Sequence, residues 1–282
     1  MANQQMLAPA EIAEYTINLA QVKASSPTGK LLALGIIAGI YIGFAANGSS
    51  YAAFNLLLSP ETLGLGRFVL GTLFPAGLML IVVSGGELFT GNCLMVMGVA
   101  EKKITLQAML RNWALVYFGN LLGAVFVAFI AYYGGMFNHG ANAFGALTIR
   151  IAASKTEMLF TKAFALGILC NILVCGTVWM IYGAKDVTGK LLACFFPIFL
   201  FAVSGYEHSV ANMFYIPAGL FAALDPALVA ASGVASSTLA NLTWGNFFIR
   251  NLLPVTLGNI VGGSFVVGGI YWLSYVRKAP DA

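Results

Sequence analysis

Two carboxylates and one histidine lie in stretches of this sequence that otherwise hold almost only small and apolar side chains. Glu87 and Glu207 each follow a short Ser-Gly segment, and His208 comes directly after Glu207. A charge at the depth of a bilayer costs several kcal/mol and usually marks a functional site. A carboxylate can also accept hydrogen bonds from backbone N–H groups that a helix break leaves free. Because the two glutamates occupy matching places, we expect both to support loops rather than to touch a substrate.

His208 could carry the more specific chemistry, because it has no counterpart in the first half of the chain. Leu88 stands in the matching place there. Histidine changes its charge near physiological pH, so His208 could draw an anion into an apolar pore or exchange a proton with a weak acid. A neutral histidine that is merely hydrogen-bonded in the core is the structural alternative. Thr90 offers a hydroxyl that could hydrogen-bond His208 or a passing anion.

Large apolar side chains and lysines near these residues could shape and charge a passage. The candidate constriction residues are Phe74, Leu78, Leu88 and Phe201. Ordinary packing would account for any one of them taken alone. Lys155 and Lys162 flank the start of a later apolar stretch. Their charge could concentrate anions there, or the two side chains could anchor a helix by snorkelling to the membrane interface.

The composition requires an apolar environment around this chain. Of its 282 residues, 60% are hydrophobic and 9% are charged, and the mean hydropathy is +0.87. A soluble domain carries roughly 25% charged residues, so most of this surface must face lipid. The net charge of +4 is small and unclustered, which argues against nucleic-acid binding. The four cysteines lie in apolar stretches without paired spacing, so we expect packing roles, no zinc site and no cofactor.

Six apolar stretches are long enough to cross a membrane, which takes about 20 residues. They are residues 31–56, 66–98, 112–135, 157–184, 190–222 and 250–275. The second and fifth are too long for one straight crossing and contain Gly-rich interruptions, so we expect two broken helices in an all-α membrane protein. Residues 1–29 predict an amphipathic helix on the membrane surface, and residues 277–282 predict a cytoplasmic tail.

An even number of spans places both termini on the same side of the membrane. Lysine and arginine are more numerous in the segments on that side, so the positive-inside rule places both termini in the cytoplasm. The N-terminal residues do not have the pattern of a secretory signal. We therefore expect a multi-pass protein of a bacterial-type inner membrane.

The two halves of the chain match each other in three places and in the same order. The matching segments are 30–36 with 162–168, 84–92 with 204–212, and 111–127 with 250–266. This pattern predicts a duplicated three-helix unit, with repeats at about 30–135 and 157–275 in a channel domain of residues 30–276. A unit with an odd number of spans must be inverted in its second copy, and inverted repeats with broken helices are typical of channels and transporters. A long polar loop, expected at about 217–249, has no counterpart of equal length in the first half and no assigned role.

The segments that carry these features resemble the formate/nitrite transporter family. They are Gly85-Gly86-Glu87-Leu88-Phe89-Thr90-Gly91-Asn92, Gly205-Tyr206-Glu207-His208-Ser209-Val210-Ala211-Asn212-Met213-Phe214 and Arg250-Asn251-Leu252-Leu253-Pro254-Val255-Thr256-Leu257-Gly258-Asn259. The resemblance extends over about residues 10–275. It implies a homopentamer of aquaporin-like protomers, each with its own pore.

The resemblance also implies a role for each candidate residue. His208 is similar to the central pore histidine of the family, and Thr90 to its partner on the first broken helix. The implied outer constriction is Phe74 with Phe201, and the implied inner one is Leu78 with Leu88. The implied polar pair on the approach to the histidine is Lys155 with Asn171, and Glu207 is implied to support the loop.

The expected function is passage of small monovalent anions of weak acids, with formate first and nitrite, hydrosulfide or lactate as alternatives. A protonated His208 could pass anions, or an anion could gain a proton and cross as the neutral acid. An aquaporin-type solute channel would use paired Asn-Pro-Ala motifs, which this sequence lacks. An intramembrane hydrolase would need a nucleophile or metal motif, and neither Gly-x-Ser-x-Gly nor His-Glu-x-x-His occurs. A scaffold would need no broken helices.

Overall fold

The computed structural model describes residues 6–277, and these fold into helices joined by short connections. Six apolar helices in this range are long enough to cross a membrane. They are α2 (Thr28–Leu57), α3 with α4 (Leu63–Ser84), α7 (Leu106–Tyr133), α9 (Phe160–Gly183), α10 (Val187–Ser204) and the last span (Trp244–Tyr275). The six expected spans and the all-α membrane class are therefore confirmed.

The second and fifth spans are interrupted where the sequence predicted. The first break separates α4 (Ala76–Ser84) from α5 (Phe89–Asn92), and the second separates α10 from α11 (Ser209–Ala222). Gly85 and Gly205 end the preceding helices with φ values of +87° and +71°. This left-handed conformation is strained for residues with a Cβ atom.

The two breaks continue differently. After α5 the first chain segment passes through a 3₁₀ turn (Cys93–Met95) into the short helix α6 (Val96–Ala100). In the second copy α11 is one continuous α-helix, which meets α12 (Pro226–Ser232) at a bend of 113°. The two repeats therefore differ in the helices that follow each break.

A shorter helix precedes the first span of each repeat. These are α1 (Pro9–Ser25), before α2, and α8 (Ala143–Thr156), before α9. The amphipathic helix expected within residues 1–29 corresponds to α1, which buries Ile12 and Ile17 against other parts of this chain. Each repeat therefore begins with one more helix than predicted, before the expected starts at residues 30 and 157.

Glycines allow the closest approach between the first and third spans of each repeat. A Cβ atom on Gly39 of α2 would collide with the backbone of Asn120 on α7. A Cβ atom on Gly258 of α15 (Leu253–Ile260) would likewise collide with the backbone of Phe164 on α9. Small residues of this kind are typical of tightly packed membrane helices.

Residues 217–249, which were expected to form a long loop, are mostly helical. Its first residues complete α11, and the rest forms α12, α13 (Ser236–Leu239) and α14 (Trp244–Asn246). The last span then contains two π-helical segments, Phe247–Leu252 and Val261–Gly269, on either side of α15, and ends in α16 (Ile270–Tyr275). The sequence gives these short helices no clear periodicity.

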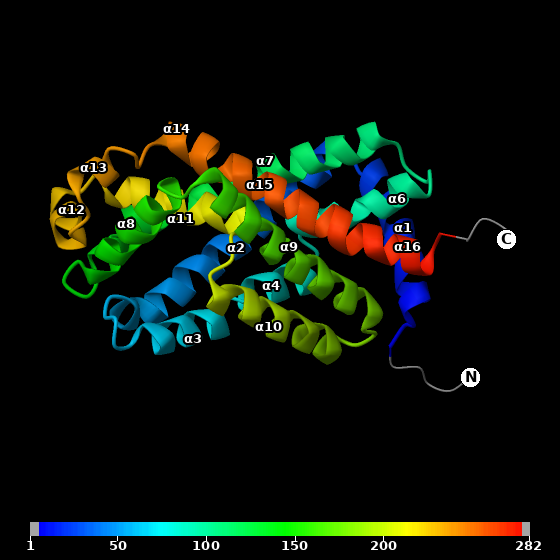
Figure 1. The fold of residues 1–282 in the computed structure, drawn as a ribbon, viewed down its shortest axis with the longest axis horizontal. Helices are drawn as coiled ribbons and strands as arrows, with labels where there is room; N and C mark the ends of the chain where they lie inside the picture. Colours follow the sequence, from blue (N-terminus) through cyan, green and yellow to red (C-terminus); the bar gives the residue numbers. More distant parts are fainter. Residues whose placement is uncertain (1–5, 278–282) are drawn as a thin grey trace.

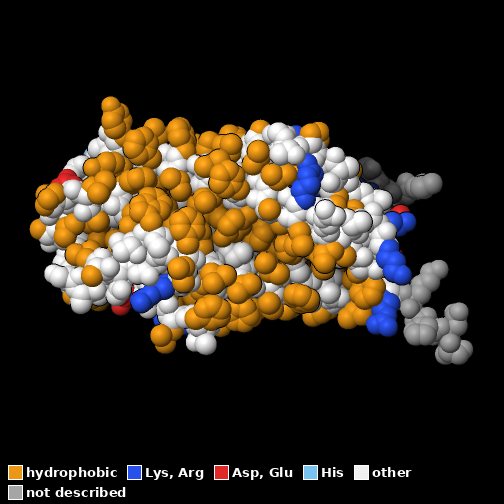
Figure 2. Space-filling model, turned by 90° about the horizontal axis from the view of Figure 1, so that it is seen from above, with side chains coloured by type: hydrophobic (Ala, Val, Ile, Leu, Met, Phe, Trp, Pro, Cys, Tyr) orange, Lys and Arg blue, Asp and Glu red, His pale blue; other side chains and the backbone are white. Residues whose placement is uncertain are grey.

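Both termini lie at one end of the molecule together with α1, α6 and α16, while α8, α12 and α13 lie at the opposite end (Figure 1). Figure 2 shows apolar side chains covering the middle of one face, with most of the lysines and arginines on that face at the end that holds the termini. Of the tail expected at residues 277–282, all but Arg277 lies outside the described residues.

Candidate functional site

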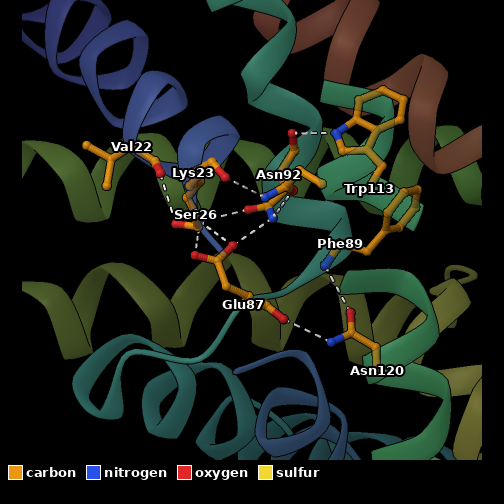
Figure 3. Close-up of polar contacts among 9 residues, drawn as sticks. Val22, Lys23, Ser26, Glu87, Phe89, Asn92, Trp113 and Asn120 are labelled. Carbon is orange, nitrogen blue, oxygen red and sulfur yellow. Dashed lines mark hydrogen bonds and ion pairs between the residues drawn. The ribbon is translucent and has the colours of Figure 1, made fainter. Parts of the chain in front are cut away.

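The first break is held in place by a charged cluster (Figure 3). Lys23, near the end of α1, donates to both carboxylate oxygens of Glu87, at 2.8 and 2.7 Å, and to Asn92 Oδ1 at 2.8 Å. Asn92 Nδ2 donates to Glu87 Oε2 and to Asn112 Oδ1, and Asn112 Nδ2 donates to the Lys23 carbonyl. The partly buried glutamate is thus paired and hydrogen-bonded, as a charge within an apolar span requires.

The second break carries the same cluster built from the second repeat. Lys155, in the last turn of α8, donates to Glu207 Oε1 at 2.6 Å. Asn212 Nδ2 donates to Glu207 Oε2 and to Asn251 Oδ1, each at 2.7 Å. Asn251 Nδ2 donates to the Lys155 carbonyl at 3.1 Å. Each half therefore holds its break with one lysine, one glutamate and two asparagines in corresponding places.

An asparagine in the third span of each repeat fixes the extended backbone after the glycine. Asn120 accepts from Phe89 N–H and donates to the carbonyls of Gly35 and Glu87. Asn259 makes the corresponding three bonds to Ser209, Gly167 and Glu207. These side chains satisfy the backbone groups that the breaks leave without helical partners.

The two breaks meet at His208 and Thr90, which both lie in the core. Thr90 Oγ1 is 2.9 Å from His208 Nε2, and the two residues are 0% and 3% exposed. His208 Nδ1 accepts from Ala211 N–H at 3.0 Å and so caps the start of α11. A ring nitrogen that accepts carries no proton, so in this arrangement the imidazole is neutral and Nε2–H donates to the Thr90 hydroxyl.

Two cavities lie near this contact: one is lined by residues of α1 and the first break, and the other by residues of α8 and the second break, among them His208. The α1-side cavity has a volume of about 550 Å³ and is lined by residues that include Lys23, Leu78, Glu87 and Leu88. The α8-side cavity has a volume of about 150 Å³ and is lined by residues that include Phe74, Lys155, Phe201 and His208. The rings of Phe74 and Phe201 lie edge to face, with centroids 5.3 Å apart. The two predicted constriction pairs thus face different cavities.

Asn171 takes a different place from the one that the resemblance implied. It is fully buried, donates to the carbonyls of Thr90 and Asn259, and is absent from the lining of both cavities. Cys175, one turn further along α9, also donates to the Thr90 carbonyl, at 3.2 Å. Asn171 therefore supports Thr90 from behind, while Lys155 reaches the α8-side cavity as an ion-pair partner of Glu207.

The sequence interpretation did not include several residues that hold the site together. Lys23 is the main omission, although it lies seven residues before Lys30 just as Lys155 lies seven before Lys162, to which Lys30 is aligned. Asparagines 92, 112, 120, 212, 251 and 259 belonged to the segments that showed the duplication. Their repetition at matching places inside apolar spans was the available signal, because unpaired amides in a membrane are costly.

A buried histidine that lines a cavity, at the point where two broken and inverted helices meet, is typical of a membrane channel or transporter. Residues 10–273 match the sequence profile of the formate/nitrite transporter family. The chain belongs to this family of multi-pass channels and transporters, and it is not an enzyme. The expected family is confirmed.

Relatives and solved structures agree with this assignment over nearly the whole chain. The chain is 38% identical to a probable formate transporter of Methanothermobacter thermautotrophicus, covering 96% of this chain and 97% of that one. It is 36% identical to the formate channel FocA of Escherichia coli, covering 97% and 96%. The structure is similar to a pentameric formate channel with formate bound, with a TM-score of 0.78, 37% identity and coverage of 89% and 98%.

Proposed function

We propose that each chain forms a pore for small monovalent anions of weak acids, with formate as its substrate. The hydrogen bond between Thr90 and His208 carries this proposal, because it joins the two breaks at a titratable group that lines the α8-side cavity, while Leu88, two residues before Thr90, lines the α1-side cavity. Relatives described as formate channels or transporters favour formate. Nitrite, hydrosulfide and lactate are the alternatives within the same family.

An anion that enters the α8-side cavity meets Lys155 before it reaches His208. The ammonium group lowers the cost of removing water from the anion, which would be high between apolar rings alone. Phe74 and Phe201 then leave little room for a hydration shell. His208 Nε2–H, which donates to Thr90, can donate to an anion oxygen instead.

Transfer of a proton to the anion would make a neutral acid, which crosses an apolar constriction at lower cost. His208 can make this transfer if Nδ1 first takes up a proton from water in the cavity: the ring then gives its Nε2 proton to formate and is left neutral, with the remaining proton on Nδ1. That proton would replace the bond from Ala211 N–H to Nδ1. In this mechanism each proton transfer therefore loosens the start of α11.

The proposal extends to assembly, location and domain limits. We expect a homopentamer in a bacterial-type inner membrane, with both termini in the cytoplasm, since a similar solved structure is a pentameric formate channel and basic side chains gather near the termini. The helix α1 lies outside the channel domain of residues 30–276 but works together with it, because Lys23 pairs with Glu87 of the first break.

Flux into proteoliposomes tests the proposed substrate. The purified protein is reconstituted, and the uptake of formate, nitrite, hydrosulfide and lactate is measured at several pH values against protein-free vesicles. Saturable formate uptake that exceeds the others and rises at acidic pH is expected. Preferred uptake of another anion would replace formate as the substrate, and no uptake of any of them would overturn the proposed function.

Replacing Thr90 with valine keeps the shape of the side chain but removes the hydroxyl that partners His208. We expect formate flux to fall about 5- to 10-fold, because a buried hydrogen bond contributes roughly 1 kcal/mol. Initial rates of formate uptake measure the effect. Thr188→Val, at an exposed threonine, is the matched control. Equal flux in Thr90→Val and wild type would show that this hydroxyl has no part in transport.

A further inference from the structure

The corresponding lysines of the two repeats, Lys23 and Lys155, differ in their hydrogen bonds, although the duplication predicts the same bonds for both. Lys23 uses all three of its N–H donors, on Glu87 Oε1, Glu87 Oε2 and Asn92 Oδ1. Lys155 makes one hydrogen bond among the described residues, to Glu207 Oε1. Both lysine side chains are 14% exposed, so the difference does not come from their burial.

The second cluster lacks two of the three lysine hydrogen bonds of the first, and one of these leaves a buried acceptor without a partner. Asn212 Oδ1 is buried without a partner, whereas the corresponding Asn92 Oδ1 accepts from Lys23. Asn212 as a whole is 0% exposed, so the missing bond leaves an acceptor unsatisfied in the core. A buried acceptor of this kind is costly, and the nearby lysine has donors to spare.

An aromatic ring lies beside Lys155. Its Nζ lies 5.5 Å from the centroid of the Tyr215 ring, close enough for a cation–π interaction. Tyr215 follows Asn212 by three residues, and the residue three after Asn92 is Met95. A methionine offers no aromatic face, so in the first repeat nothing of this kind competes with Asn92 for the ammonium group.

We propose that Tyr215 is a positioning residue that holds Lys155 away from Asn212, so that its free N–H groups face the α8-side cavity and bind the incoming anion. Lys155 and Tyr215 both line this cavity together with His208. When Tyr215 does not hold the ammonium group of Lys155, this group donates a hydrogen bond to Asn212 Oδ1 instead. Lys23 and Lys155 thus divide two roles, one structural and one that binds substrate.

The proposal rests on the proposed anion transport and is tested by exchanging the residue that differs. In Tyr215→Met, which copies the first repeat, we expect Lys155 to bond Asn212 as Lys23 bonds Asn92. The formate concentration for half-maximal uptake should rise about fivefold, while maximal flux stays within about twofold. Tyr215→Phe keeps the ring and should retain a half-saturation close to that of wild type. A merely structural role would reduce maximal flux in both variants.

A cryo-electron microscopy structure of each variant measures the position of Lys155 without reference to any substrate. Lys155 Nζ within hydrogen-bond distance of Asn212 Oδ1 in Tyr215→Met, but not in Tyr215→Phe, is the expected result. An unmoved Lys155 or an unchanged half-saturation in Tyr215→Met would overturn the proposal. If wild type carries no formate, the proposed function fails, but the structures still decide where Tyr215 places the lysine. Tyr215→Leu serves as a second ring-free variant if Tyr215→Met does not assemble.

Discussion

Formate uptake by His208→Ala should lose the rise at acidic pH that we expect of the wild-type protein. His208 is the titratable side chain that contacts the Thr90 hydroxyl, and it lines the α8-side cavity. Without it, an anion at the constriction has no group that can hand it a proton. We expect uptake at acidic pH to fall roughly 100-fold, as for loss of a group that transfers protons. Initial rates in proteoliposomes between pH 5 and pH 8 measure this.

Leu88→Ala is the matched control, because Leu88 holds the corresponding place in the first repeat. This substitution shortens a side chain without removing a titratable group. It should keep the rise in uptake at acidic pH. Protein-free vesicles give the background of formic acid that crosses the lipid unaided. A His208→Ala protein whose uptake still rises at low pH above that background would rule out proton transfer through this histidine.

Replacing Asn259 with leucine should destabilise the protein more than any other change discussed above. The substitution leaves Ser209 N–H and the carbonyls of Gly167 and Glu207 without their side-chain partners. Each orphaned buried group costs about 1–3 kcal/mol, and hydrogen bonds between membrane helices often contribute less. We therefore expect a loss of about 2–6 kcal/mol in total. Thermal unfolding of the detergent-purified protein, followed by size-exclusion chromatography, measures the shift.

Asn138→Leu provides the control, because Asn138 lies exposed in the connection between α7 and α8. Its melting temperature should stay within a few degrees of wild type. If Asn259→Leu melts at the same temperature as the control, the bracing role of the buried amide is wrong, and water or a local shift must satisfy the three backbone groups.

The sequence was sufficient to predict the two breaks. Glycine followed by glutamate inside an overlong apolar stretch occurs twice, and both occurrences proved to be left-handed helix ends followed by an extended segment. The pairing of His208 with Thr90 was also foreseen, since inverted repeats bring corresponding breaks together. These features depend on local sequence and on symmetry, which a sequence displays directly.

The parts that could not be predicted depend on contacts between distant residues. Lys23 reaches Glu87 across 64 positions in the chain, and Asn171 reaches the Thr90 carbonyl across 81. Neither separation follows from periodicity or composition. The helix α8 was not predicted either, because its sequence has only a weak amphipathic pattern and gave no reason to expect a helix that corresponds to α1.

The side chains of Asn120 and Asn259 hold main-chain atoms of the two breaks, so these bonds do not depend on which side chains stand at positions 88 and 208. His208 adds the cap of α11 and the contact with Thr90. A substitution at either position therefore leaves the asparagine bonds to the backbone in place. A duplicated ancestor with the same residue in both copies could have acquired a histidine in one of them in a single step. The same freedom makes positions 88 and 208 the natural starting points for engineering a pore with a new selectivity.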